Sequence, residues 1–239
     1  SIPQDYVSVD LETTGLNPKI DKIIEIGMVI VRNGQVEQEY STLVNPYQQL
    51  RPETVELTGI RDEMLTDAPG ISRVIGKCLE LCGDLPLLGH KILFDYSFLK
   101  KAAVNEGMEF EKQGIDTLKL CRKFMPEAEK KNLSSACVYY GVDLTGAHRA
   151  SHDALATHEL YQRLTVAYGE AAEEEFLPKP LIYKIKREQP ATKRQKEVLR
   201  ELLKYHKIGV TVQIDHLSRN EISRLTDKII LQYGRMSKR

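Results

Sequence analysis

Two carboxylates near the start of the chain, Asp10 and Glu12, are the side chains whose type and spacing best suit chemistry. In a β-strand, residues i and i+2 project from the same face, so a strand over residues 6–12 places both acids side by side. Two like charges at this distance repel unless a cation lies between them. Because Mg²⁺ and Mn²⁺ favour carboxylate oxygens, the spacing predicts a divalent metal site. The alternative is a solvated strand end carrying two unconnected acids.

A second motif, LLGHKILFDYSFL, occupies residues 87–99. The apolar run at 85–88 predicts a short buried strand, and Gly89 interrupts it. Phe94, Phe98 and Ala102 then follow at four-residue spacing, which indicates a helix with Asp95 near its start. A carboxylate is favourable at that end of a helix. The alternative for Asp95 is therefore an acid that stabilises the first turn and has no catalytic role.

A third motif, HRASHDALAT, occupies residues 148–157. His148 precedes Asp153 by five residues at the beginning of an amphipathic helix that runs to about residue 168. This spacing predicts His148 in a loop and Asp153 on the helix. The alternative for His148 is an ordinary surface histidine.

In chain order the three motifs supply Asp, Glu, Asp, His and Asp, and this set resembles the DEDD superfamily of 3′-5′ exonucleases, in the subgroup with a final H-x-x-x-x-D motif. The resemblance covers roughly residues 5–170. Within the superfamily the chain is most similar to the epsilon-type proofreading exonucleases of bacterial DNA polymerase III, because residues 52–60 (PETVELTGI) and 67–69 (DAP) are typical of that group. Asp116-Thr117 also fits the pattern. Lys91 departs from it, since many relatives carry Asn there.

The resemblance implies an RNase H-like α/β fold and hydrolysis of a phosphodiester with two divalent cations, Mg²⁺ or Mn²⁺, about 3.5–4 Å apart. One cation would lower the pKa of a water, and the other would stabilise the leaving 3′ oxygen. His148 would act as general base, a role suited to a group that titrates near neutrality. The implied metal ligands are four carboxylates: Asp10, Glu12, Asp95 and Asp153.

The resemblance also implies how a nucleotide is held. The backbone of Thr13, Thr14 and Gly15 would contact the terminal nucleotide, with Leu16 beside its base. Phe94 and Phe98 could add apolar surface for stacking, although their helical spacing favours burial in the core. Gly15 suits a strand that turns beside a ligand.

The expected substrate is the 3′ end of single-stranded or frayed DNA, in proofreading or repair, and a DNA polymerase is a candidate partner. An exoribonuclease resembling oligoribonuclease or RNase T is an alternative, because discrimination rests on contacts to the 2′ position of the sugar. A non-catalytic nucleic-acid-binding adaptor is another. No apolar run reaches the length of a membrane helix, so we expect no membrane partner and a cytoplasmic protein.

The remaining pattern predicts a mixed sheet flanked by helices. Apolar residues mark strands over 22–33 and 35–44, and Asn33-Gly34 between them predicts a type I′ hairpin turn. Strand-helix alternation follows, as in an RNase H-like α/β domain. The four cysteines (Cys78, Cys82, Cys121 and Cys137) lack zinc spacing and are expected to be buried free thiols. A zinc site at His148, His152 and His158 is disfavoured because no thiolate accompanies them.

Charge divides the chain into two parts. Residues 1–175 contain 18 Lys and Arg against 28 Asp and Glu, whereas residues 176–239 contain 16 against 6. We predict an RNase H-like exonuclease domain over 1–175, a Pro-containing linker over 176–190 and a basic helical mini-domain over 191–239. Two capping boxes (Thr192 with Gln195, Ser218 with Glu221) predict the starts of its helices. Its charge makes nucleic acid a candidate partner. The alternatives are that it docks on the acidic part of the chain or that its charges form a solvated face.

Overall fold

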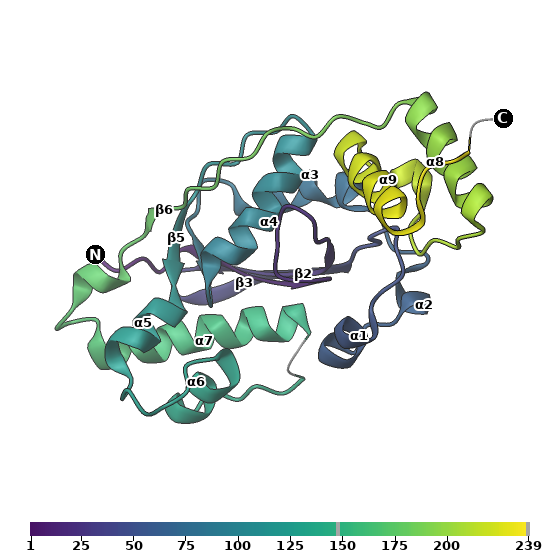
Figure 1. The fold of residues 1–239 in the computed structure, drawn as a ribbon. Helices are drawn as coiled ribbons and strands as arrows, with labels where there is room; N and C mark the ends of the chain where they lie inside the picture. Colours follow the sequence, from purple (N-terminus) through teal and green to yellow (C-terminus); the bar gives the residue numbers. More distant parts are fainter. Residues whose placement is uncertain (147–148, 238–239) are drawn as a thin grey trace. The chain divides into compact units, whose positions relative to one another are not determined.

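The computed structural model describes residues 1–146 and 149–237 and contains two compact units. The larger unit comprises Ser1–Pro46 and Leu50–Ile185. The smaller unit comprises Tyr47–Gln49 and Lys186–Arg239, so the chain enters it twice. Figure 1 shows the ribbon of both units, which are described separately below.

The larger unit is built on a six-stranded mixed sheet of order β3-β2-β1-β4-β5-β6. Strands β1, β4 and β5 are parallel to one another, and β2, β3 and β6 are antiparallel to their neighbours. Strand β1 is central, as its run of buried residues requires. The strands are β1 (Tyr6–Thr13), β2 (Ile23–Arg32), β3 (Gln35–Leu43), β4 (Leu87–Gly89), β5 (Gln113–Asp116) and β6 (Lys179–Pro180).

The β2–β3 hairpin has the predicted two-residue turn. Asn33 and Gly34 have φ values of 50° and 73°, the positive angles that a type I′ turn needs at both central positions. Arg32 pairs with Gln35 directly beside the turn. The turn prediction is confirmed.

Helices cover both faces of the sheet (Figure 1). On one face, α3 (Ile71–Cys82) and α4 (Ile92–Asn105) share a core with alternate residues of β1 and β2. On the other face, the core contains α5 (Thr117–Phe124), α6 (Leu133–Tyr140) and α7 (Ala150–Tyr168). Two short helices, α1 (Pro52–Thr58) and α2 (Asp62–Leu65), follow β3. All four cysteines are buried free thiols, as expected. The fold is the predicted helix-flanked mixed sheet.

The boundary of the larger unit lies ten residues beyond the predicted one. Phe176, at the end of a 3₁₀ turn (Glu173–Phe176), is buried, and so is Leu181. Between them β6 pairs with β5, as Lys179 lies opposite Gly114. The first part of the predicted linker is therefore the sixth strand of the sheet, since two buried side chains anchor it.

The smaller unit consists of α8 (Lys193–His206), a 3₁₀ turn (Ile214–His216) and α9 (Arg219–Tyr233). Both predicted capping boxes are present. The apolar faces of the two helices pack on one another through Leu199, Leu202, Leu203, Ile222 and Ile229. The segment Tyr47–Gln49 joins this unit through a bridge between Gln48 and Val212 and through stacking of Tyr47 on His216 at 3.5 Å between ring centroids.

Within residues 1–146 and 149–237, no helix combines the length and the apolar character that crossing a bilayer would require.

Candidate active site

The alternation of side chains along β1 directs Asp10 and Glu12 toward α7. Two earlier residues on the same face fasten the helix to the strand. The Tyr6 hydroxyl is 2.6 Å from His158 Nδ1, and Ser8 Oγ donates to the Ala154 carbonyl at 2.6 Å. Continuing along this face, the strand brings its two carboxylates to the beginning of α7, where Asp153 lies.

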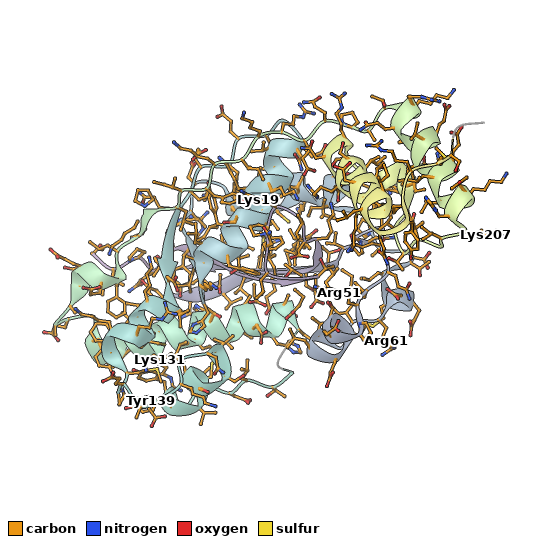
Figure 2. The ribbon with its side chains drawn as sticks, in the orientation of Figure 1. Lys19, Arg51, Arg61, Lys131, Tyr139 and Lys207 are labelled. Carbon is orange, nitrogen blue, oxygen red and sulfur yellow. The ribbon has the colours of Figure 1, made fainter. Side chains whose placement is uncertain are left out.

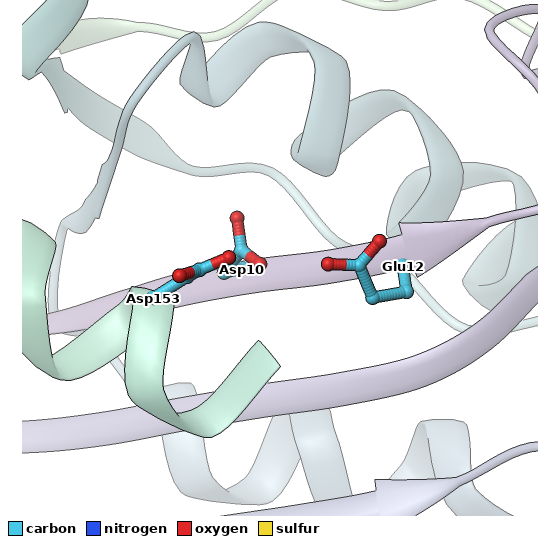
Figure 3. A group of neighbouring side chains, drawn as sticks. All are labelled: Asp10, Glu12 and Asp153. Carbon is cyan, nitrogen blue, oxygen red and sulfur yellow. The ribbon is translucent and has the colours of Figure 1, made fainter. Parts of the chain in front are cut away.

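Asp10, Glu12 and Asp153 form a cluster of carboxylates (Figure 3). One oxygen from each side chain lies within 4.8 Å of the others. Asp153 is only 8% exposed. Three residues predicted from two separate motifs, 143 positions apart at the extremes, therefore meet at one place.

Asp95 approaches the same strand from α4 and is 3% exposed. Its Oδ1 accepts a hydrogen bond from the Leu11 backbone N–H at 3.1 Å. This N–H is accessible because β4 pairs with β1 only at Val7 and Ser8, which leaves the later part of that edge uncovered. Asp95 is thus held against the backbone between Asp10 and Glu12.

The carboxylates affect one another electrostatically. Burial and the neighbouring Asp95, Asp153 and Glu12 raise the pKa of Asp10 well above its usual range. Burial together with Asp153 and Glu25 raises the pKa of Glu12 to about 8, although Arg149 opposes the shift. Burial also raises the pKa of Asp95 strongly. Gathering these acids therefore costs free energy near neutral pH unless positive charge is supplied.

This set of ligand atoms fits a hard divalent cation. Oxygen-only ligands from several carboxylates are those that Mg²⁺ and Mn²⁺ prefer. In the described part of the chain, Asp10, Glu12 and Asp153 form the one group of three or more such residues close enough to hold a metal. Two of the histidines considered for zinc are engaged elsewhere: His152 Nδ1 is 3.1 Å from the Gly146 carbonyl, and His158 contacts Tyr6.

Glu25 is a further carboxylate that the sequence motifs did not reveal. It lies directly opposite Glu12 on β2 and is 3% exposed, and like charges opposite one another destabilise a sheet. Arg149 compensates, because its Nε and Nη2 donate to Glu25 Oε2 at 3.1 and 2.7 Å. The sequence does contain a signal for Glu25, since it is the one charged residue within the largely apolar run of 23–31.

Glu25 also caps α7. Arg149, at the N-cap position, provides no side-chain cap, and the Ala150 N–H donates instead to Glu25 Oε1 at 2.8 Å. The first turn of a helix leaves such N–H groups without partners in the helix. The capped turn begins one turn before Asp153, so Glu25 helps to position that carboxylate.

Gly27 allows α7 to approach the sheet closely. A Cβ atom at this position would lie 2.3 Å from the Ala150 carbonyl carbon, a distance that no side chain tolerates. Gly27 is also the direct partner of Asp10 across β1 and β2. The absence of a side chain thus sets the separation between Asp10 and the start of α7.

The predicted nucleotide-contacting segment follows β1. Thr14 N–H donates to the Lys22 carbonyl at 2.8 Å, and the Thr14 carbonyl accepts from Arg51 Nη2 at 2.7 Å. Both the N–H and the carbonyl of Thr14 therefore have hydrogen-bond partners within the protein. Thr13 Oγ1 donates to the Gly15 carbonyl at 2.7 Å, and a Cβ at Gly15 would lie 2.4 Å from the Asp21 carboxylate. Leu16 is 83% exposed.

The two phenylalanines differ in exposure. Phe98 is 3% exposed and belongs to the core, so it has no face to offer a base, whereas Phe94 is half-buried.

Lys91 precedes α4 at its N-cap position and has a left-handed conformation (φ 73°), with its N–H donating to Asp116 Oδ1 at 2.9 Å. Asp116 Oδ1 also accepts from Leu118 N–H at 2.8 Å at the start of α5. Asp116 therefore connects the turn before Asp95 to the next helix.

His148 lies outside the described residues, so its expected role as general base stays a prediction. Arg149, the next residue, is held by Glu25 as described above.

Comparison with known proteins agrees with this geometry. The profile of the family described as Exonuclease matches residues 7–161. The PolC-type DNA polymerase III of Bacillus cereus is 38% identical over 162 residues, covering 67% of this chain and 11% of the polymerase. That of Bacillus subtilis is 38% identical over 164 residues with the same shares. The chain thus spans about a tenth of the length of these relatives.

Solved structures share the fold. Exonuclease X in complex with 5′ overhanging duplex DNA has a TM-score of 0.58 and 26% identity, covering 71% of this chain and 96% of that one. Escherichia coli exonuclease I in complex with a dT13 oligonucleotide has a TM-score of 0.63 at 16% identity, covering 72% and 43%.

The fold and the carboxylate cluster define a nuclease of the RNase H-like class. The chain belongs to the exonuclease family, and the resemblance to DEDD exonucleases is confirmed.

Proposed function

We propose that the chain is a metal-dependent 3′-5′ exonuclease that removes nucleotides from the 3′ end of single-stranded or frayed DNA. The observation that carries the proposal is the cluster of Asp10, Glu12 and Asp153, with one oxygen of each within 4.8 Å of the others. Membership of the exonuclease family and the order of the three motifs support it.

The carboxylates of Asp10, Glu12 and Asp153 would hold one divalent cation, and Asp10 with Asp95 would serve a second. When bound, two such cations activate a water and stabilise the leaving oxygen of the phosphodiester. The contribution of the protein is to keep the acids in place. Leu11 N–H fixes the Asp95 carboxylate, and the Glu25–Arg149 pair caps the helix that carries Asp153.

His148 would accept the proton of the attacking water as general base. The exposed side chain of Leu16, immediately after the Thr13–Gly15 turn, would contact the terminal base. Phe94 adds a half-exposed ring on α4, whereas Phe98 serves the core. The relatives named above are a polymerase and two DNA-bound exonucleases, which supports DNA as the substrate and a polymerase as a candidate partner.

The test uses single-stranded DNA and RNA oligonucleotides labelled at either the 3′ or the 5′ end, incubated with Mg²⁺, with Mn²⁺ or with chelator. We expect metal-dependent shortening from the 3′ end, abolished in Asp10→Asn. Asp67→Asn, which alters an exposed aspartate, is the matched control and should keep full activity. Faster cleavage of RNA would reassign the substrate. Tight binding of the strand without cleavage in the presence of either metal would indicate a non-catalytic adaptor instead of an enzyme.

A further inference from the structure

The smaller unit carries an uneven charge that the exonuclease family does not account for. Its main segment, residues 186–239, contains 14 lysines and arginines against six acidic residues and lies outside the matched residues 7–161. Its apolar faces are already used, because the leucines of α8 pack against the isoleucines of α9. Its charged surface is therefore mainly basic.

The cations of α8 are arranged on one side. Residues at positions i, i+3, i+7 and i+11 of a helix share a face. In α8 these positions hold Lys193, Lys196, Arg200 and Lys204, and Lys207 follows at the C-cap. Figure 2 labels Lys207 at the end of this helix. We call these five residues the α8 basic stripe.

Little of this positive charge is neutralised. Asp215 accepts from Arg200 at 3.0 Å and lies 3.7 Å from Lys196, so one carboxylate serves two cations. Glu197 pairs instead with Arg194, outside the stripe. Lys193, Lys204 and Lys207 are exposed and have no ion pair with any residue that the structure describes. Both ends of the stripe therefore carry unpaired ammonium groups.

The dimensions suit a nucleic-acid backbone. Fourteen residue steps of a helix rise about 21 Å, which spans about six phosphates at roughly 3.4 Å per nucleotide. A row of lysines and arginines along a helix is the electrostatic footprint of phosphate binding.

We propose that the α8 basic stripe binds the phosphodiester backbone of a nucleic-acid strand, giving the chain a second nucleic-acid contact besides the carboxylate cluster.

The test measures binding of the full chain to fluorescent 20-nucleotide DNA and RNA strands by anisotropy, in chelator and across a series of salt concentrations. The stripe variant combines Lys193→Gln, Lys204→Gln and Lys207→Gln. The control variant removes the same charge from other exposed positions of the unit, through Arg194→Gln, Arg224→Gln and Lys228→Gln. Because binding is read without metal, the result is independent of whether the chain cleaves the strand.

We expect the stripe variant to bind about 10- to 100-fold more weakly at 0.1 M salt, with the slope of log K against log salt smaller by about 2. In the control variant, the slope of log K against log salt should change by less than a third of the change seen in the stripe variant. Equal losses of affinity in both variants would show that binding depends only on the total charge of the unit, and would overturn the proposal. Unchanged binding, with lower thermal stability in the stripe variant, would also overturn it and indicate pairing with acidic groups of the chain. A loss confined to DNA or to RNA would support the proposal and identify the strand.

Discussion

Glu12 provides a direct measure of how strongly the carboxylate cluster repels itself without metal. Its pKa is raised from 4.5 to about 8 in the fold, by burial and by Asp153 and Glu25. The unfolded chain therefore releases this proton near pH 4.5, while the folded chain keeps it until about pH 8. Metal-free protein should lose stability as pH rises through this window, and Glu12→Gln should remove that loss.

The magnitude follows from the shift. At about 1.4 kcal/mol per pH unit, the shift sets an upper limit of about 5 kcal/mol. Partial solvent access to Glu12 reduces this to about 2 kcal/mol, because exposed charges are screened by solvent. For a domain of this size, that corresponds to an increase in Tm of about 4–8 °C.

The assay is thermal unfolding in chelator at pH 5 and at pH 8. Glu12→Gln should raise Tm at pH 8 and leave it nearly unchanged at pH 5, and Mn²⁺ should stabilise the wild-type chain more than the variant. Glu37→Gln, at an exposed position of β3, is the matched control. A variant that melts at or below the wild-type temperature at pH 8 would refute the argument that these acids oppose one another in the fold.

Three further changes test the elements around the site, and a fourth, in α3, serves as a comparison for one of them. Glu25→Gln removes the charged acceptor that holds Arg149 and caps α7, so we expect a loss of about 1–3 kcal/mol in the free energy of unfolding and a lower kcat, measured by denaturant titration and steady-state kinetics. Gly27→Ala should lower stability by at least about 2 kcal/mol, since its Cβ would overlap the Ala150 backbone. Gly76→Ala in α3, where a Cβ meets only Met108 Cε at 3.6 Å, should instead raise stability by about 0.5–1 kcal/mol, and equal melting temperatures for the two variants would contradict this account. Leu16→Ser should raise KM for oligonucleotides without changing Tm, and an unaltered KM would exclude Leu16 from substrate contact.

The parts of the site that rest on local periodicity could be predicted from sequence. Two-residue alternation places Asp10 and Glu12 on one face, and the Asn33-Gly34 pair specifies the hairpin turn. The capping boxes of α8 and α9 are equally local, because every atom involved lies within four residues.

The parts that rest on distant contacts could not be predicted. Glu25 meets Arg149 across 124 positions, and Asp95 reaches the Leu11 N–H across 84. No spacing rule connects such pairs, because the sheet order brings them together. The sequence predicts a linker where the sixth strand lies for the same reason: the two residues of this strand pair with a strand more than 60 positions earlier.

The short segment Tyr47–Gln49 has a consequence for how the chain is made. Its partners in the smaller unit, such as Val212 and His216, are synthesised about 165 residues after it. At 5–20 residues per second, this interval is on the order of ten to thirty seconds of translation. The strands of the sheet, which end at Pro180, are all synthesised before Val212 and His216. The contact between Tyr47–Gln49 and the rest of the smaller unit is therefore one of very high sequence separation, the kind that forms slowly.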